Sequence, residues 1–520
     1  MSLTSYADSA LSLIPPLLAI SMAVVTRKVL PSLGVGILAG ILMLTQFDLG
    51  AAATHLAQTV SGLFVEDGGA NWGNLYILLF LVILGATTAL ISASGSARAF
   101  ADWARQRIRT KRDAKLLTMA LGVVVFIDDY FNSLVVGSVS RPITDRYYVS
   151  RAKLAYILDS TAAPVCVISP VSSWGAYIIA LIGGLLAARG YDGGGQLATF
   201  VQMIPMNFYA IFALILLFAV VWFGLDVGPM LRHEIKAQKG ELYDPERGNP
   251  PGTNAELEEA NNGSVAGLFG PIITLVVATA SFMVASGAAE LADAGQAFSI
   301  LGAFENTNVG YSLFNGSVAG LAVTLVFAFK QRLEGQLIVQ AVIAGARSML
   351  PAAYILLFAW AIGGIIGEVE TGKYLVSQLE GAIAPEYMPM VLFLLAGFTA
   401  FSTGTSWGTF GIMLPIAADM AMGTDTTLML PMLSAVLAGA VFGDHCSPIS
   451  DTTILSSTGA GCHHIDHVTT QLPYALMVAG ISLVGYLVLG MTHSLITALL
   501  VCSVLVTLVI ALLKFKQSRY

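Results

Sequence analysis

Residues 116–140 read LLTMALGVVVFIDDYFNSLVVGSVS and lie directly between two basic residues, Lys115 and Arg141. A helix needs about 20 apolar residues to cross the hydrocarbon core of a membrane, so two crossings need about 40. Short basic loops stay on the cytoplasmic side, and a single crossing would place one of these two flanks outside. We therefore predict a helical hairpin at residues 116–140 that enters the membrane partway and returns.

The whole chain has the composition of a membrane protein. Of its 520 residues, 56% are hydrophobic and 11% are charged, with a mean hydropathy of +0.78, whereas an average soluble domain is about 25% charged. Its 25 basic and 32 acidic residues give a net charge of −7, which excludes nucleic-acid binding. The four cysteines form no CxxC pair, and no GxxxxGK[ST] loop is present. We expect no enzyme and no cofactor other than coupling ions.

The order of apolar runs and basic loops predicts an all-α polytopic membrane protein with eleven crossings and two hairpins. The N-terminus should lie outside and the C-terminus inside. The first half covers residues 1–230 and contains a long crossing at about 154–187, which Pro164 and Pro170 should break because proline removes a backbone hydrogen bond. Residues 231–264 are polar and rich in Pro, Gly, Asn and Glu, which predicts a cytoplasmic linker.

The second half, residues 265–490, repeats this plan in the opposite orientation, and the pentapeptide YILLF occurs in both halves. An apolar stretch at about 388–422, with FSTGTSWGTFG in its middle, predicts a second hairpin. The sequence GDHCSPISDTT should break a second long crossing at about 428–458, and residues 491–520 add one extra span. Inverted repeats with interrupted helices are typical of secondary transporters, whose binding sites lie where the interrupted helices meet.

The hairpin tips and the broken helices hold nearly all polar residues at membrane depth, including Asp128, Asp129 and Asn132 at the first tip. Carboxylates at this depth are costly and usually functional. Since no Lys or Arg accompanies them, their charge must be balanced by bound cations or protons. Carboxylate, hydroxyl and carbonyl oxygens are ligands suited to a hard cation such as Na⁺. The sequence therefore predicts a cation-coupled carrier.

A second group of polar residues could suggest a metal site. It consists of Cys462, His463, His464, Asp466 and His467. Because the group falls between two predicted spans on the cytoplasmic side, we expect a solvated loop or an interfacial face that responds to pH.

Two long segments resemble the NhaC-type Na⁺/H⁺ antiporter family, a branch of the ion-transporter superfamily. Residues 127–177 begin IDDYFNSLVVGSVSRP, and residues 442–475 begin FGDHCSPISDTT. The resemblance extends over nearly the whole chain and implies a scaffold plus a transport domain, paired hairpins, and Na⁺ moved against H⁺ or coupled to a solute. Members resembling this family are also assigned to malate/lactate exchange and to amino-acid uptake. Asp128 stands where many members carry Gly, which creates an Asp-Asp pair.

The family pattern implies a set of residues for ion and substrate binding. The implied binding residues are Asp128, Asp129, Asn132, Asp159, Ser172, Ser173, Thr405, Ser406, Asp444 and Asp451. Among them the Na⁺ candidates are Asp129, Asn132, Ser173, Thr405, Ser406 and Asp451. Further expectations are Na⁺, H⁺ and the lipid bilayer as partners, a multi-pass location in a bacterial-type inner (cell) membrane, and a homodimer.

We predict a Na⁺/H⁺ antiporter that works by alternating access, in which Asp128 and Asp129 exchange protons for Na⁺, since adjacent carboxylates cannot both stay ionised cheaply. The alternative is a Na⁺-coupled transporter, or exchanger, of an amino acid or other small organic solute. It is motivated by polar residues in excess of what one Na⁺ needs and by Trp174 and Trp407, which can wall a pocket. The lack of an intramembrane Arg argues against a dicarboxylate. A channel is disfavoured because no ring of identical filters is present.

Overall fold

The structure is a computed structural model that describes residues 4–517, except for residues 27, 67, 106–107, 127, 171, 189, 191–195, 253–259, 261, 372–373 and 375–382. This part of the chain is almost entirely helical. Its one sheet has two short antiparallel strands, β1 (Val65–Glu66) and β2 (Gly69–Ala70). The prediction that the protein is built from helices is therefore confirmed for the described residues.

Seven helices of the described chain are long and apolar enough to cross a membrane. They are α4 (Trp72–Ala93), α14 (Val265–Asp293), α16 (Val309–Lys330), α19 (Met388–Thr403) with η5 (Pro385–Tyr387), α21 (Met429–Cys446) with η6 (Thr426–Leu428), α23 (His464–Thr492) and α24 (Leu495–Gln517). An eighth span is formed if α11 (Gln196–Met203), η3 (Ile204–Met206) and α12 (Phe208–Phe223), which bend by 53°, count as one. Such a set of apolar helices is that of a multi-pass membrane protein.

The remaining helices of the described residues include α17, which is 34 residues long, and a set of mostly shorter helices. They are α1 (Ile14–Thr26), α2 (Val29–Leu44), α3 (Leu49–Gly62), α5 (Ser96–Arg105), α6 (Lys111–Val124), α7 (Asp129–Phe131), α8 (Gly137–Arg146), α9 (Arg151–Ile168), α10 (Ser173–Ala188), α13 (Pro229–Gln238), α15 (Ile300–Glu305), α17 (Gly335–Glu368), α20 (Ser406–Gly423) and α22 (Asp451–Ala460). Short turns η1 (Ala10–Leu13) and η4 (Pro245–Arg247) and a π-helical segment η2 (Asn132–Val136) complete the list.

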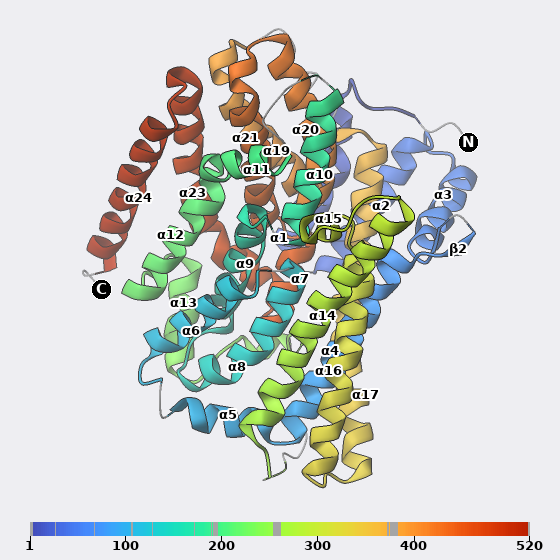
Figure 1. The fold of residues 1–520 in the computed structure, drawn as a ribbon, viewed down its shortest axis with the longest axis vertical. Coiled ribbons are helices and arrows are strands. Elements are labelled where there is room, and N and C mark those ends of the chain that lie inside the picture. Colours follow the sequence, from blue (N-terminus) through green and yellow to red (C-terminus); the bar gives the residue numbers. More distant parts are fainter. Residues whose placement is uncertain are drawn as a thin grey trace.

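The helices form two groups with the interrupted elements between them (Figure 1). On one side α4 packs against α16 and α17, and α14 packs against α16. On the other side α24 packs against α23, which also contacts α12 and α21. The short helices α7, α9 and α10 lie between these groups (Figure 1). Polar side chains on the interrupted elements are therefore placed deep inside the molecule.

Two interruptions occur in the first half. The helix α6 ends at Val124, Val125 and Phe126 are not helical, and α7 begins at Asp129. The helices α6 and α8 pack against each other. The second interruption separates α9 from α10. Pro170 lies in that gap, whereas Pro164 lies inside α9 without ending it. Only one of the two prolines therefore marks the break.

Two further interruptions occur in the second half. Between α19 and α20, Gly404 adopts a left-handed backbone with φ of 71°. A Cβ atom at this position would lie 2.5 Å from the backbone oxygen of Ile449, so the close approach and the positive φ both require glycine. The second gap lies between Cys446 and Asp451, where Ser450 caps α22 by accepting a hydrogen bond from the Thr453 amide. Because Ile449 lies in this second gap, its close approach to Gly404 places the two gaps next to each other.

The segment predicted as a linker also contains structure. Its helix α13 packs against α9, and the buried Glu234 forms an ion pair with Lys111 at 2.6 Å. Glu234 also accepts hydrogen bonds from the amide and the hydroxyl of Ser150, each at 2.8 Å. Burial alone raises the pKa of Glu234, but the charges of Lys153 and Lys111 outweigh it, so the pKa lies below its ordinary value.

Of the two alternatives for residues 462–467, the solvated loop is wrong, because the helix α23 already begins at His464. The alternative of a face that responds to pH stays a prediction. All five side chains of the group are buried. His464 is hydrogen-bonded to the Pro448 carbonyl at 2.8 Å, and His467 is hydrogen-bonded to the Asp159 carboxylate at 3.2 Å. His464 therefore connects α23 to the non-helical gap before α22, and His467 connects α23 to α9.

Candidate functional site

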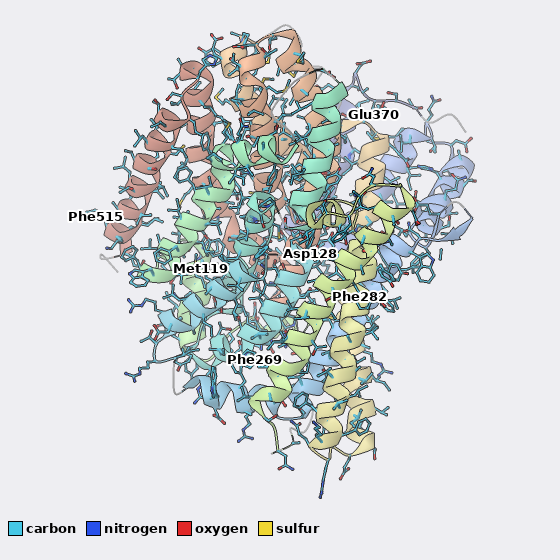
Figure 2. All side chains as sticks on the ribbon, in the orientation of Figure 1. Met119, Asp128, Phe269, Phe282, Glu370 and Phe515 are labelled. Atoms are coloured by element: carbon cyan, nitrogen blue, oxygen red, sulfur yellow. The ribbon has the colours of Figure 1, made fainter. Side chains whose placement is uncertain are left out.

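A cavity of about 480 Å³ lies where the interruptions meet α4, α16 and α17. Figure 2 shows Asp128, one of its lining residues, in the middle of the molecule. The lining residues described are Asn74, Ile77, Asp128, Asp129, Tyr130, Gly310, Trp360, Gly363, Gly364, Thr403, Gly404, Thr405, Trp407 and Asp451. Both halves of the chain therefore contribute to a single site.

Three carboxyl groups face this cavity. Asp128 and Asp129 are each 2% exposed, and Asp451 is half-buried. Among the lining residues that the structure describes there is no Lys, Arg or His. Ionising several buried carboxyl groups that lie close together is costly. The cavity therefore offers negative charge that a proton or a bound cation can neutralise.

Hydrogen bonding leaves part of this oxygen set free. Asp451 accepts hydrogen bonds from the hydroxyl of Tyr130 and from the Thr452 amide, the latter at 2.8 Å. The Oδ2 atom of Asp129 is buried and has no hydrogen-bond partner among the residues that the structure describes. At least one buried carboxylate oxygen is therefore available to a ligand.

Asn132 has a structural task next to the cavity. Its amide nitrogen donates hydrogen bonds to the carbonyls of Gly122 at 2.5 Å, Val125 at 2.8 Å and Thr161 at 3.2 Å. Gly122 and Val125 lie at the end of α6, where helix carbonyls lack intrahelical partners, and Thr161 lies inside α9, so Asn132 satisfies the end of α6 and ties it to α9. The amide oxygen of Asn132 is buried and has no hydrogen-bond partner in the described part of the chain. Asn132 does not line the cavity, although it holds the backbone beside it.

In the second half, Thr405 lines the cavity and caps α20, while the next residue turns away from it. The hydroxyl of Ser406 donates to the Oδ2 atom of Asp444 at 2.7 Å. Asp444 is 1% exposed and does not line the cavity, and no residue that the structure describes hydrogen-bonds its Oδ1 atom. Ser406 and Asp444 thus form a separate buried pair directly behind the cavity wall.

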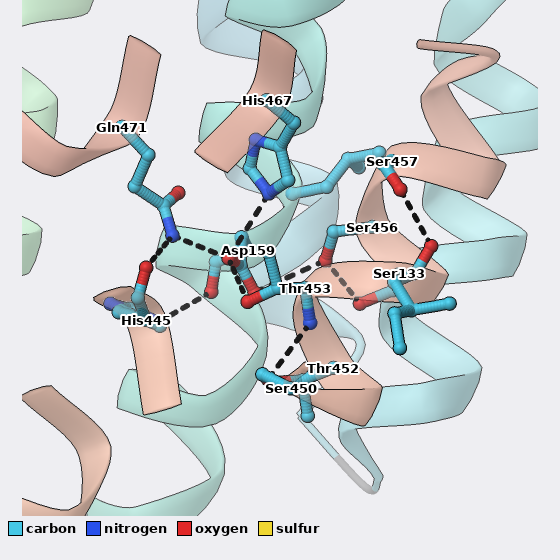
Figure 3. Close-up of polar contacts among 12 residues, drawn as sticks. Ser133, Asp159, His445, Ser450, Thr452, Thr453, Ser456, Ser457, His467 and Gln471 are labelled. Atoms are coloured by element: carbon cyan, nitrogen blue, oxygen red, sulfur yellow. Dashed lines mark hydrogen bonds and ion pairs between the residues drawn. The ribbon is translucent and has the colours of Figure 1, made fainter. Parts of the chain in front are cut away.

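Asp159 belongs to another network, drawn in Figure 3. Its carboxylate accepts hydrogen bonds from Thr453 at 3.1 Å, Ser456 at 3.2 Å, His467 at 3.2 Å and Gln471 at 2.5 Å. The donors come from α22 and α23, so the network ties α9 to both helices (Figure 3). Four donors stabilise an ionised carboxylate without a bound cation.

The two serines at the start of α10 complete the predicted set. The hydroxyl of Ser172 donates to the Cys166 carbonyl at 2.7 Å and accepts from the Gly175 amide at 2.8 Å, so it bridges the gap before α10. Ser173 is the first residue of α10, and its side chain lies outside the described part of the structure. Of the ten predicted residues, the cavity brings together Asp128, Asp129, Thr405 and Asp451.

Several lining residues were missed by sequence reasoning. Tyr130 and Trp360 are the largest of them, and Asn74 adds a polar group. Tyr130 directly follows the Asp-Asp pair, which is the one sequence signal that could have found it. Trp407 lines the cavity as predicted. Trp174 is 1% exposed and packs edge-on against Trp407, with 6.0 Å between the ring centroids.

A family model and the named relatives of this chain point to the same family. A model described as the Na⁺/H⁺ antiporter family matches residues 165–491. An uncharacterized protein of Haemophilus influenzae is 52% identical over 497 residues, which cover 95% of this chain and 93% of that protein. Another H. influenzae protein, named an uncharacterized Na⁺/H⁺ antiporter, is 32% identical over 36% of this chain and 40% of its own length.

A third relative is the malate-2H⁺/Na⁺-lactate antiporter of Bacillus subtilis. It is 30% identical over 29% of this chain and 32% of its own length. The named relatives are thus transporters and not enzymes. The family match covers more than half of the 520 residues. The chain therefore belongs to the Na⁺/H⁺ antiporter family, as the resemblance of its two long motifs predicted, and is a multi-pass membrane transporter.

Proposed function

We propose that this protein exchanges Na⁺ for H⁺ by alternating access and that the exchange takes place at the cavity of Asp128, Asp129 and Asp451. The observation that carries the proposal is the meeting of three carboxyl groups in one interior cavity that no described basic residue lines. Neighbouring carboxyl groups share protons because ionising all of them at once is costly. A Na⁺ ion that binds to these oxygens displaces protons, and the reverse holds after release.

The Na⁺ ligands follow from the same geometry. Asp129, Asp451 and Thr405 supply oxygens at the cavity, and oxygen ligands suit a hard cation. The unpartnered amide oxygen of Asn132 is a further proposed ligand. Ser406 and Ser173 stay in the proposed set, although the hydroxyl of Ser406 already binds Asp444.

The remaining topology belongs to the same proposal. Eleven crossings, two hairpins formed by α6 with α8 and by α19 with α20, and two inverted repeats would place the interrupted helices at the bilayer midplane. The N-terminus would lie outside and the C-terminus inside, in the inner membrane of a bacterium, with two copies forming a homodimer. The direct packing of α6 on α8 and of α19 on α20 supports the hairpins.

Proteoliposomes containing the purified protein test the exchange. An imposed Na⁺ gradient should move protons, and Asp129→Asn should slow this movement about tenfold or more, since a hydrogen-bonding charged ligand contributes on the order of 1.5–3 kcal/mol. The control is Asp425→Asn, which changes a carboxylate in the surface turn at Thr427. If the native protein moves no protons in response to Na⁺, or if both variants behave alike, the proposal is overturned.

A second candidate is Na⁺-coupled transport or exchange of a small organic solute. The cavity volume of about 480 Å³ favours it, because small-molecule sites usually span about 300–1,000 Å³. One relative is named as an antiporter of malate and lactate. Solutes that raise the thermal stability of the protein only in the presence of Na⁺ would support this candidate.

A further inference from the structure

The walls of the cavity contain features that a Na⁺ ion does not need. Two indole rings, of Trp360 and Trp407, and the phenol ring of Tyr130 line it together with the three aspartates. Na⁺ prefers oxygen ligands and gains little from ring surface. From this combination we propose that the cavity also binds a small organic cation with an ammonium group, which competes with Na⁺ for the aspartates. The inference rests on the proposed function, because it assigns a substrate class to the same site.

The charge of the site selects the sign of the solute. Asp128, Asp129 and Asp451 all face the cavity, and no described Lys, Arg or His lines it. An anionic solute would place like charges together without a basic side chain to pair them. An ammonium group instead supplies positive charge, and the buried Oδ2 atom of Asp129, which no described residue hydrogen-bonds, is available to it.

The aromatic rings suit an organic cation in particular. Cations are attracted to the faces of Trp and Tyr rings, and quaternary ammonium ligands are recognised in this way. Trp407 is held in place by stacking on Tyr177, with centroids 4.5 Å apart and planes inclined by 21°. The edge of Trp174 packs against Trp407 as well. The ring wall is therefore already positioned before a ligand binds.

Glycines on α17 create the space that such a solute requires. Gly363 and Gly364 line the cavity beside Trp360. A Cβ atom added at Gly364 would meet no atom within 4 Å, so at this point the wall opens into free volume. The same holds for Gly367, one turn further along the helix, but Gly367 is not among the lining residues. These two glycines provide a matched pair of sites for mutation.

The experiment compares three probes of similar shape in proteoliposomes and in detergent. Choline carries a fixed positive charge, 3,3-dimethyl-1-butanol is its neutral carbon analogue, and glycine betaine adds a carboxylate. Choline at twice its inhibition constant should raise the apparent KM for Na⁺ about threefold by mass action, and it should raise the melting temperature. The neutral analogue should do neither, and betaine should be weaker than choline. Equal effects of choline and the neutral analogue would overturn the proposal.

Variants of α17 locate the binding site. Gly364→Val should raise the inhibition constant of choline about tenfold more than it raises the KM for Na⁺, because a side chain then occupies the solute's space. Gly367→Val should leave the ratio of the two constants unchanged. Trp360→Leu should weaken choline about fivefold, and Trp360→Phe should restore most of that loss because a ring face is retained. Equal ratios in both glycine variants would contradict the assignment.

The outcomes separate this inference from the proposed function. If the protein exchanges Na⁺ for H⁺ but choline neither competes nor stabilises it, the ammonium site is excluded and the exchange stands. If no Na⁺/H⁺ exchange occurs, but choline raises the melting temperature and Gly364→Val abolishes this effect, the exchange is excluded and the ammonium site stands.

Discussion

At the scale of single residues, the contact between Tyr130 and Asp451 joins the two halves of the chain inside the cavity. The phenol hydroxyl donates to the Oδ2 atom of Asp451, 321 positions away in the sequence. Both residues line the cavity. The hydroxyl therefore fixes the direction of a proposed Na⁺ ligand without being charged itself, and a carboxylate held in this way loses less freedom when it binds an ion.

Removing that hydroxyl should weaken the response to Na⁺. In Tyr130→Phe the ring remains, but of the two described hydrogen bonds to the Asp451 carboxylate the one from the Thr452 amide alone is kept. A hydrogen bond contributes about 0.5–1.5 kcal/mol, so we expect the apparent KM for Na⁺ in proteoliposomes to rise about three- to tenfold. Tyr76→Phe is the control, since the Tyr76 ring packs against Tyr311 and Phe314 and does not line the cavity. An unchanged KM in Tyr130→Phe would show that the hydroxyl does not position Asp451.

The residues of the cavity were predictable from sequence to different degrees. Asp128 and Asp129 stand out because carboxylates at membrane depth are rare and costly. Tyr130 does not stand out, since a tyrosine in an apolar run is usually packed like any other aromatic residue. Likewise, the partners of Asp159 lie 294 to 312 positions along the chain. Contacts of this kind depend on how the helices pack, which local patterns do not record.

At the scale of elements, α22 connects the cavity to the rest of the fold. Its first residue, Asp451, lines the cavity, while Thr453 and Ser456 on the same helix donate to Asp159 on α9. His467 on α23 donates to the same carboxylate. The three helices are therefore joined through one buried anion, and its loss should affect stability more than that of a surface charge.

Asp159→Asn tests this network. The new amide group would face hydrogen-bond donors with a donor of its own, and a buried polar group without a partner costs about 1–3 kcal/mol. We expect a clearly lower melting temperature in detergent. Asp145→Asn serves for comparison because its ion pair with Arg151, at 3.1 Å, lies nearer the surface and such pairs contribute about 0–1 kcal/mol. Equal melting temperatures for the two variants would argue against a structural role of Asp159.

Element boundaries were predictable where a sequence pattern has a direct physical meaning. The basic residues on both sides of residues 116–140 predict a hairpin, and α6 ends inside this segment at Val124. The small polar run Ser402–Ser406 predicts a break, and α19 ends inside it at Thr403. Short helices outside the long apolar runs, such as α3 and α5, were not anticipated. Their sequences are less apolar than a membrane span, and packing against neighbouring helices decides whether such segments form helices.

At the scale of the whole molecule, the proposed orientation can be measured directly. The four native cysteines are buried, so background labelling should be low. A cysteine at Thr492 should lie outside, next to the turn between α23 and α24, and one at Lys514 should lie inside. Both side chains are exposed. A membrane-impermeant maleimide added to intact cells should therefore label Thr492→Cys and leave Lys514→Cys unlabelled until the cells are opened.

The reverse pattern of labelling would place the C-terminus outside and would invert the proposed topology. Labelling of both cysteines in intact cells would mean that α24 does not cross the membrane. The helix α24 is one of the most apolar of the described helices, and 17% of its most apolar 18-residue stretch is buried inside the protein. Its remaining surface must therefore face lipid or another protein.

The helix α22 contributes Asp451 to the cavity and is also hydrogen-bonded to Asp159, and this has a thermodynamic consequence. If Na⁺ bound at the proposed site moves Asp451, it also moves Thr453 and Ser456 of α22, which donate to Asp159, so the tilt of α9 and α23 and the occupancy of the proposed ion site are not independent variables. Linkage is reciprocal. Any lipid, ligand or substitution that biases the tilt of those two helices must change the affinity for the ion by the same factor by which the ion biases the tilt.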